Sequence, residues 1–299
     1  MRLRAVNRRI ERACAAASRP AGSVRLLAVS KTWEAERVLE LAALGQRAFA
    51  ENYLQEALSK IESCRAQSAG LGGRTPQPLD PEPPRAERAD LQPLKPKPHD
   101  LEWHFIGPIQ SNKTRPIAEN FDWVHSIDRE RIARRLSEQR PSGMSPLEAC
   151  VQVNVSGEAS KSGCTPEEAV ALALAVAAMP GLRLRGLMAI PEPDHDEGVL
   201  RRRFALLASL AGEIRNALAR LDPEGSLSRN FDTLSMGMSD DLEAAIAEGA
   251  TMVRVGTALF GKRRGKPGEA SARAINPAAI NPEAVNPEAV NPDAINPSV

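Results

Sequence analysis

Short apolar runs alternate with helical patterns along most of the chain. The apolar runs predict eight strands, at residues 25–30, 47–51, 101–106, 122–127, 149–155, 182–190, 231–236 and 251–259. Helical periodicity separates consecutive strands, except where a Pro-rich segment intervenes between the second and the third. Strands that alternate with helices are typical of a parallel sheet with helical crossovers. The pattern therefore predicts an α/β protein.

Helix signals lie where this pattern needs them. Residues 1–17 are rich in arginine, and their apolar positions follow helical spacing, at Leu3, Val6, Ile10, Ala13, Cys14 and Ala17. The spacing predicts an amphipathic first helix rather than a transit peptide. Thr165, with Glu168 three positions later, predicts an N-cap with a capping box. Ser239, followed by two aspartates, predicts another helix start, because carboxylates stabilise the positive end of the helix dipole.

Two segments differ from this pattern in composition. Residues 65–99 contain eight prolines together with glycine, serine and charged residues, and we expect a disordered surface insertion there. After Gly261 the chain becomes basic, and from Asn276 onward five Asn-Pro pairs recur every five residues. Proline at that spacing excludes helix and sheet, so residues 266–299 are predicted to be a disordered tail. A docking motif and a solvated repeat without a role both fit such a tail.

The remainder has the size of one domain. Without the insertion and the tail, on the order of 230 residues are left, which suits a single compact α/β barrel. Eight strand–helix units within residues 1–265 predict a (β/α)8 barrel of the TIM type with an extra N-terminal helix. A doubly wound open sheet is the alternative. In a barrel, reactive groups are expected at the carboxyl ends of the strands.

Composition argues against several classes of function. The 299 residues carry 39 Lys and Arg against 38 Asp and Glu, a net charge of +1, so nucleic acid and anionic membranes are not expected partners. The longest apolar run, residues 169–179, is too short to span a membrane. The four cysteines form no CxxC pair and have no histidine at metal-ligand spacing, so neither a metal site nor a disulfide framework is expected. Reduced thiols indicate the cytoplasm.

The predicted strand ends carry candidate chemistry. Lys31 follows the first strand, where desolvation in a barrel mouth would lower its pKa and favour a Schiff base, while an ordinary surface lysine is the alternative. In barrels the loops after strands seven and eight commonly hold phosphate. Here these loops contain Ser235, Gly237 and the pair Gly256-Thr257, which offer backbone N–H groups and hydroxyls. Together these residues predict a site for a phosphorylated aldehyde.

Seven sequence motifs lie in order from the first predicted strand to Gly261. They are LLAVSKT (26–32), AENYLQEALSK (50–60), WHFIGPIQSNKT (103–114), SKSG (160–163), RGLMAIP (185–191), LSMGMSDD (234–241) and MVRVGTALFG (252–261). In these motifs the chain resembles the pyridoxal phosphate homeostasis protein family, also called YggS/PROSC. The resemblance implies an alanine-racemase-like barrel without that enzyme's second domain, and binding of pyridoxal 5′-phosphate (PLP) through a lysine.

Taken position by position, the resemblance implies the residues of a PLP site. Lys31 would be the Schiff-base lysine, and Arg254 would face the pyridine nitrogen. The phosphate would be bound by Ser235, Gly256 and Thr257.

Two further positions match residues near the cofactor in the resembled family. These are Asn52 and His104, and for both of them structural hydrogen bonding is the alternative role. Ala50 departs from the family, which usually has glycine in a Gly-Glu-Asn-Tyr motif, so the turn there is expected to differ slightly.

An arginine at the pyridine nitrogen limits the expected chemistry. Because arginine stays protonated, Arg254 would keep that nitrogen an unprotonated acceptor and weaken the ring as an electron sink. The chain has one tyrosine, Tyr53, and we expect no second domain to supply another. The expected function is therefore to bind PLP as a lysine Schiff base and to take part in intracellular PLP and amino acid homeostasis, without efficient catalysis.

Two other functions stay open. A PLP-dependent amino acid racemase, lyase or transaminase of weak activity would use His104 or Tyr53 as a second proton carrier, and a purely structural barrel would leave Lys31 inert. Besides PLP, we expect amino acids as ligands and transient contact with PLP-dependent enzymes. A monomer is expected, because the resemblance does not include the dimer-forming domain of the racemase.

Overall fold

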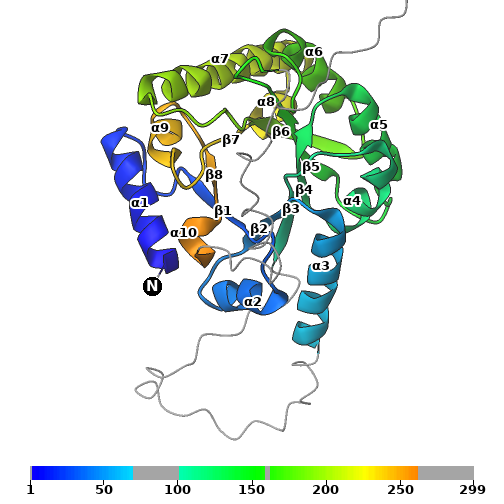
Figure 1. Cartoon of the computed structure of the whole chain (residues 1–299). Helices are drawn as coiled ribbons and strands as arrows, with labels where there is room; N and C mark the ends of the chain where they lie inside the picture. Colours follow the sequence, from blue (N-terminus) through cyan, green and yellow to red (C-terminus); the bar gives the residue numbers. More distant parts are fainter. Residues whose placement is uncertain (1, 70–100, 159–161, 262–299) are drawn as a thin grey trace, which may run out of the picture. The chain divides into compact units, whose positions relative to one another are not determined.

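Eight parallel strands close into a barrel in the computed structural model, which describes residues 2–69, 101–158 and 162–261 (Figure 1). The strands are β1 (Arg25–Val29), β2 (Ala48–Glu51), β3 (Glu102–Phe105), β4 (Trp123–Ile127), β5 (Leu147–Gln152), β6 (Leu182–Met188), β7 (Thr233–Ser235) and β8 (Met252–Val255). Each strand pairs with its neighbour in sequence, and β8 pairs with β1 to close the sheet. The predicted (β/α)8 barrel is confirmed, and the open sheet is excluded.

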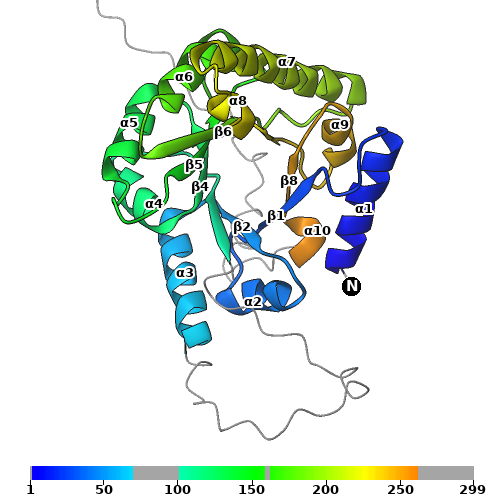
Figure 2. The ribbon, with the colours of Figure 1, turned by 180° about the vertical axis from the view of Figure 1, so that it is seen from behind.

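Helices surround the strands, as the views from both sides show (Figures 1 and 2). They are α1 (Arg2–Ala16), α2 (Ala35–Ala43), α3 (Leu54–Ala69), the 3-10 helix η3 (Ser111–Lys113), α4 (Thr114–Asn120), α5 (Glu130–Gln139), α6 (Pro166–Ala177), α7 (Glu197–Leu221), α8 (Ser226–Asn230), α9 (Leu242–Ala247) and α10 (Thr257–Phe260). Within the residues that the structure describes, none of these helices is long and apolar enough to cross a membrane.

The predicted amphipathic N-terminal helix is confirmed as α1. Its apolar face is buried, and the helix contacts α9 and α10. Arg9, on its polar face, forms an ion pair with Glu243 of α9 and donates a hydrogen bond of 2.6 Å to the carbonyl oxygen of Ser239. The first helix therefore fastens the last part of the barrel to its beginning.

The two predicted helix starts have different outcomes. Thr165 and Glu168 form the predicted capping box, in which Thr165 Oγ1 accepts from the Glu168 amide and a Glu168 carboxylate oxygen accepts from the Thr165 amide. Helix α9 begins only at Leu242. The side chain of Asp241 accepts from the amide of Met238, so it holds the preceding turn instead of capping the helix.

Several predicted boundaries are shifted, and two of them differ most from the structure. The eighth strand ends at Val255 rather than at residue 259, because Gly256 begins the short helix α10. Helix α3 continues to Ala69, so residues 65–69 are not part of an insertion; they include arginine, alanine and glutamine, which are good helix formers. The rest of the predicted insertion, residues 70–99, and the predicted tail, residues 266–299, lie outside the described residues.

Apolar packing fills the space between strands and helices, whereas the inside of the barrel is partly polar. A small apolar cluster there comes from alternate positions of neighbouring strands: Leu27, Ala48, Ala50, Ile106 and Met252. Four fully or almost fully buried polar side chains accompany it: His104, His125, Ser235 and Arg254. Buried polar groups need hydrogen-bond partners, so their partners define what this interior can do.

Candidate functional site

Strand register brings the residues after β1, β2 and β8 to the same edge of the barrel. Val29 is paired with Ala50 of β2, and Ala28 with Val255 of β8. A Cβ atom added at Gly256 would lie 3.3 Å from the carbonyl oxygen of Val29, which shows how closely the end of β8 approaches β1. The predicted residues Lys31, Asn52, Gly256 and Thr257 therefore gather at the carboxyl ends of three adjacent strands.

Lys31 lies half-buried in a tight turn directly after β1. The next residue, Thr32, has a φ of 68°, a left-handed conformation that is costly for a β-branched side chain. Its amide donates a hydrogen bond of 2.5 Å to Glu56 Oε1 on α3. Trp33 stacks on Phe260 of α10, with ring centroids 5.6 Å apart. Contacts on both sides thus hold the turn that carries the lysine.

A cluster of charged side chains, centred on the buried Lys60, contacts the same turn. Lys60 Nζ on α3 donates to the carbonyl oxygen of Ser30 at 2.8 Å, to Glu51 Oε1 at 2.6 Å and to Glu56 Oε1 at 2.9 Å. Ser30 Oγ also donates to Glu51 Oε1, at 2.6 Å. Burial raises the pKa of Glu51, and Lys60 opposes that shift. Sequence reasoning missed Lys60, whose only signal was its helical i,i+4 spacing from Glu56.

Asn52 has an unsatisfied acceptor next to the lysine turn. Its Oδ1 atom is buried and has no hydrogen-bond partner among the residues that the structure describes, and the same holds for Glu51 Oε2. The backbone of Asn52 is packed against Gly107, where an added Cβ atom would lie 2.1 Å from the Asn52 carbonyl oxygen. A buried acceptor without a partner is costly unless a ligand or water satisfies it. The position fits a polar ligand bound at this edge.

Arg254 is held inside the barrel just below the end of β8. Its Nη1 atom donates to Ser235 O at 2.5 Å and to Ser235 Oγ at 2.9 Å, and its Nη2 atom donates to the carbonyl oxygen of Ala189 at 2.9 Å. Burial lowers the pKa of Arg254 to about 10, so the guanidinium remains charged at neutral pH. The predicted pair Ser235 and Arg254 is thus in direct contact.

His104 is not at the strand ends but deeper in the barrel. Its Nδ1 atom lies 2.8 Å from Nε2 of His125, and its Nε2 atom is hydrogen-bonded to Glu102 at the start of β3. Nδ1 of His125 lies 2.9 Å from Ser235 Oγ. Burial lowers the pKa of His104 and lowers that of His125 further, so both rings are neutral at pH 7. Sequence reasoning did not single out His125, which links His104 to the predicted site.

Tyr53, the other candidate proton carrier, lies beside the start of α3 and is 54% exposed. Thr257 is exposed as well, and Gly256 is half-buried at the N-cap of α10. The candidate phosphate-binding pair is therefore accessible from solvent, whereas Ser235 and Arg254 are buried.

Comparison with known proteins places this barrel in a class. A family model described as "Alanine racemase, N-terminal domain" matches residues 1–264. A pyridoxal phosphate homeostasis protein of Pseudomonas aeruginosa is 55% identical over 255 residues, which cover 85% of this chain and 91% of the relative. That of Escherichia coli K12 is 44% identical over 258 residues, which cover 86% of this chain and 94% of the relative.

Solved structures agree with the sequence relatives. PipY of Synechococcus elongatus, determined with PLP bound, matches with a TM-score of 0.61 and 32% identity, covering 84% of this chain and 100% of PipY. A D-threonine aldolase of Filomicrobium marinum, at 17% identity and a TM-score of 0.56, shares the fold. The class is therefore the alanine-racemase-type barrel. Within it, this chain belongs to the pyridoxal phosphate homeostasis protein family.

Proposed function

We propose that this protein binds PLP at the carboxyl edge of the barrel and takes part in intracellular PLP and amino acid homeostasis. The observation that carries the proposal is the gathering of Lys31, Asn52, Gly256 and Thr257 at adjacent strand ends, in a chain that is 32% identical to a PLP-bound relative. When bound, PLP supplies an electrophilic aldehyde that an amine can hold covalently.

Each residue then has a distinct task. Lys31, fixed by the turn after β1, would hold the aldehyde carbon through its amine. Asn52 offers its unsatisfied Oδ1 atom as an acceptor for a polar group of the ligand. Gly256 and Thr257 bind the phosphate through a backbone N–H and a hydroxyl, together with the turn that follows Ser235. Arg254 would face the pyridine nitrogen.

Efficient catalysis is not part of the proposal. The charged guanidinium of Arg254 would keep the pyridine nitrogen unprotonated and so weaken the ring as an electron sink. Both ring nitrogens of His104 are already engaged, with Glu102 and with His125, inside the barrel. These features support a carrier more strongly than a racemase or lyase that needs a second proton carrier.

The visible spectrum of the purified full chain tests this function. We expect an absorbing chromophore that borohydride fixes to the protein, and we expect its loss in Lys31→Ala but not in the matched control Lys113→Ala, which changes a lysine of η3. Incubation with L-amino acids, followed by chiral product analysis, should change the spectrum without steady turnover. A protein that takes up no added PLP contradicts the proposal, and steady turnover would make the chain an enzyme.

Localisation, oligomeric state and partners belong to the same proposal. We place the protein in the cytoplasm as a monomer, with PLP and amino acids as ligands and transient contact with PLP-dependent enzymes that receive the cofactor. Sedimentation of the PLP-loaded protein tests the monomer. Transfer of the chromophore from unreduced, PLP-loaded protein to an apo-enzyme tests delivery.

A further inference from the structure

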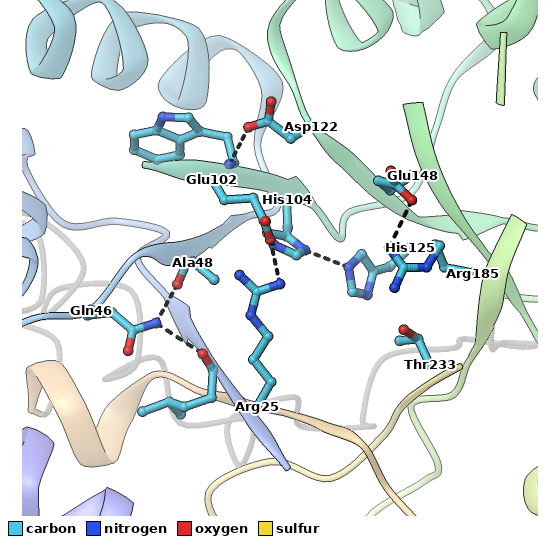
Figure 3. A network of polar contacts seen from close by, with 12 residues as sticks. Arg25, Gln46, Ala48, Glu102, His104, Asp122, His125, Glu148, Arg185 and Thr233 are labelled. Carbon is cyan, nitrogen blue, oxygen red and sulfur yellow. Dashed lines mark hydrogen bonds and ion pairs between the residues drawn. The ribbon is translucent and has the colours of Figure 1, made fainter. Parts of the chain in front are cut away.

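A chain of hydrogen bonds crosses the barrel interior below the proposed cofactor site. It runs from Glu102 of β3 through His104 and His125 to Ser235 of β7, and Arg254 contacts its last member. Figure 3 shows the first part, with Arg25, Glu102, His104 and His125 pointing toward one another. Strands β3, β4 and β7 thus supply one continuous series of polar groups.

The Glu102 end of this hydrogen-bond series lies at the amino face of the barrel. Glu102 lines a cavity of about 440 Å³ there, and its side chain is 30% exposed. Arg25 forms an ion pair with it, at 2.9 Å. Burial alone would raise the pKa of Glu102, but His104 and Arg25 lower it to about 2. Glu102 is therefore a carboxylate at neutral pH, and a carboxylate can only accept hydrogen bonds.

An acceptor at one end fixes the direction of every bond that follows. Since Glu102 accepts, the proton of neutral His104 must sit on Nε2, which leaves Nδ1 as an acceptor. His125 must then carry its proton on Nε2, and its own Nδ1 becomes an acceptor. The remaining donor is the hydroxyl of Ser235, which gives its proton to His125.

The charges around the two rings favour these neutral forms. Arg25 and Arg254 are the cations near His125, and each disfavours its protonation. Glu102 and Asp122 are the carboxylates near His104, and burial outweighs their attraction for a second proton. With these tautomers, protonation of His104 would also put its Nδ1–H opposite the Nε2–H of His125, and protonation of His125 would take away the acceptor for the Ser235 hydroxyl.

We propose that Glu102 is a positioning residue that acts across the barrel, since it directs the hydroxyl proton of Ser235 to His125 and so leaves Ser235 Oγ as an acceptor for Arg254. This inference refines the proposed cofactor site. With its proton committed, Ser235 anchors Arg254, and the phosphate would be bound by the turns without the Ser235 hydroxyl as a donor.

Nitrogen-15 NMR of labelled histidines in the full chain tests the direction of the bonds, because two-bond couplings identify the nitrogen that carries the proton. In the wild type without PLP, at neutral pH, we expect both His104 and His125 as the Nε2–H tautomer. An Nδ1–H tautomer for His125 would overturn the proposal. This measurement needs no variant and no cofactor, so it stands apart from the test of PLP binding.

Glu102→Gln then tests action at a distance. The amide can donate as well as accept, so the fixed direction is lost, and we expect the unprotonated Nδ1 signal of His125 to diminish although residue 102 does not touch that ring. The matched control is Glu148→Gln, which changes another carboxylate of the same cavity that pairs with Arg183 and Arg185. An unchanged His125 tautomer in Glu102→Gln would refute the positioning role.

Discussion

Lys60 Nζ lies 2.6 Å from Glu51 Oε1, and both side chains are almost completely excluded from solvent. The pair joins α3 to the end of β2, and through Ser30 it reaches the turn that carries Lys31. A buried pair of this kind contributes less to net stability than its short distance suggests, but removal of one partner leaves an uncompensated charge.

Lys60→Met is therefore expected to reduce the free energy of unfolding by about 3–5 kcal/mol. Urea unfolding followed by circular dichroism measures the loss. The double variant Lys60→Met/Glu51→Gln removes both charges and should recover a large part of it. If Lys60→Met were as stable as the wild type, the pair would not be a charged pair in the folded protein.

Gly107→Ala should disturb the site through the backbone of Asn52. The new Cβ atom would lie 2.1 Å from the Asn52 carbonyl oxygen, and a backbone atom cannot give way as a flexible side chain can. We expect a loss of about 1–3 kcal/mol in stability, the usual cost of overpacking. PLP affinity, followed by absorbance titration, should fall at the same time.

Gly212→Ala is the matched control for that substitution. Gly212 lies within α7, and nothing lies within 4 Å of the added Cβ atom. Because alanine favours helix, this variant should gain about 0.5–1 kcal/mol and bind PLP as the wild type does. Equal behaviour of the two variants would mean that the close approach of Gly107 to Asn52 does not matter.

Acidification should weaken the fold through the buried histidines. Burial keeps the pKa of His125 well below its usual range, whereas the same residue in the unfolded chain titrates near 6.5. Below pH 6.5 the unfolded chain therefore binds a proton that the folded protein does not, and the free energy of unfolding falls as the pH falls.

The size of this effect is testable with one variant. Between pH 6 and 5, the free energy of unfolding of His125→Gln should fall less steeply than that of the wild type, by up to about 1.4 kcal/mol per pH unit. The reason is that the variant's unfolded chain no longer binds a proton at position 125. Urea unfolding at a series of pH values gives both slopes. Parallel slopes would show that His125 is protonated inside the barrel.

The thiols should resist modification in the folded protein. All four cysteines are buried, and burial raises the pKa of Cys64 to about 11 and that of Cys164 to about 12. Since the thiolate is the reactive form, a disulfide reagent such as DTNB should react slowly with native protein and fully after unfolding. Rapid reaction of one thiol before unfolding would reveal local opening around it.

Strand and helix identity could be read from the sequence, because each element carries its own period of apolar residues. Leu3, Val6 and Ile10 fixed the buried face of α1, and the strand ends located Lys31. The end of β8 was not readable, since Gly256 interrupts an apolar run that continues to Phe260 in a different conformation. Local pattern cannot show where backbone direction changes within such a run.

The interior of the barrel was beyond the reach of local pattern for another reason. Whether His104 meets His125, and which of them meets Ser235, depends on the stagger of strands around the closed sheet. That stagger is a property of the whole barrel and not of any one segment. The resemblance placed His104 near the cofactor, whereas the contacts place it two hydrogen bonds away from Ser235 Oγ.

Pairing of β1 with β8 brings Lys31 to the same edge of the barrel as Gly256 and Thr257. Lys31 comes from the beginning of the barrel sequence, and the other two residues come from its end. During synthesis the ribosome releases the lysine long before the strand that precedes its proposed phosphate-binding partners. A growing chain therefore contains the proposed Schiff-base lysine but only part of the proposed phosphate site. PLP binding then requires that β8 has joined the sheet. The absorbance of bound PLP would therefore report completed folding as well as ligand content.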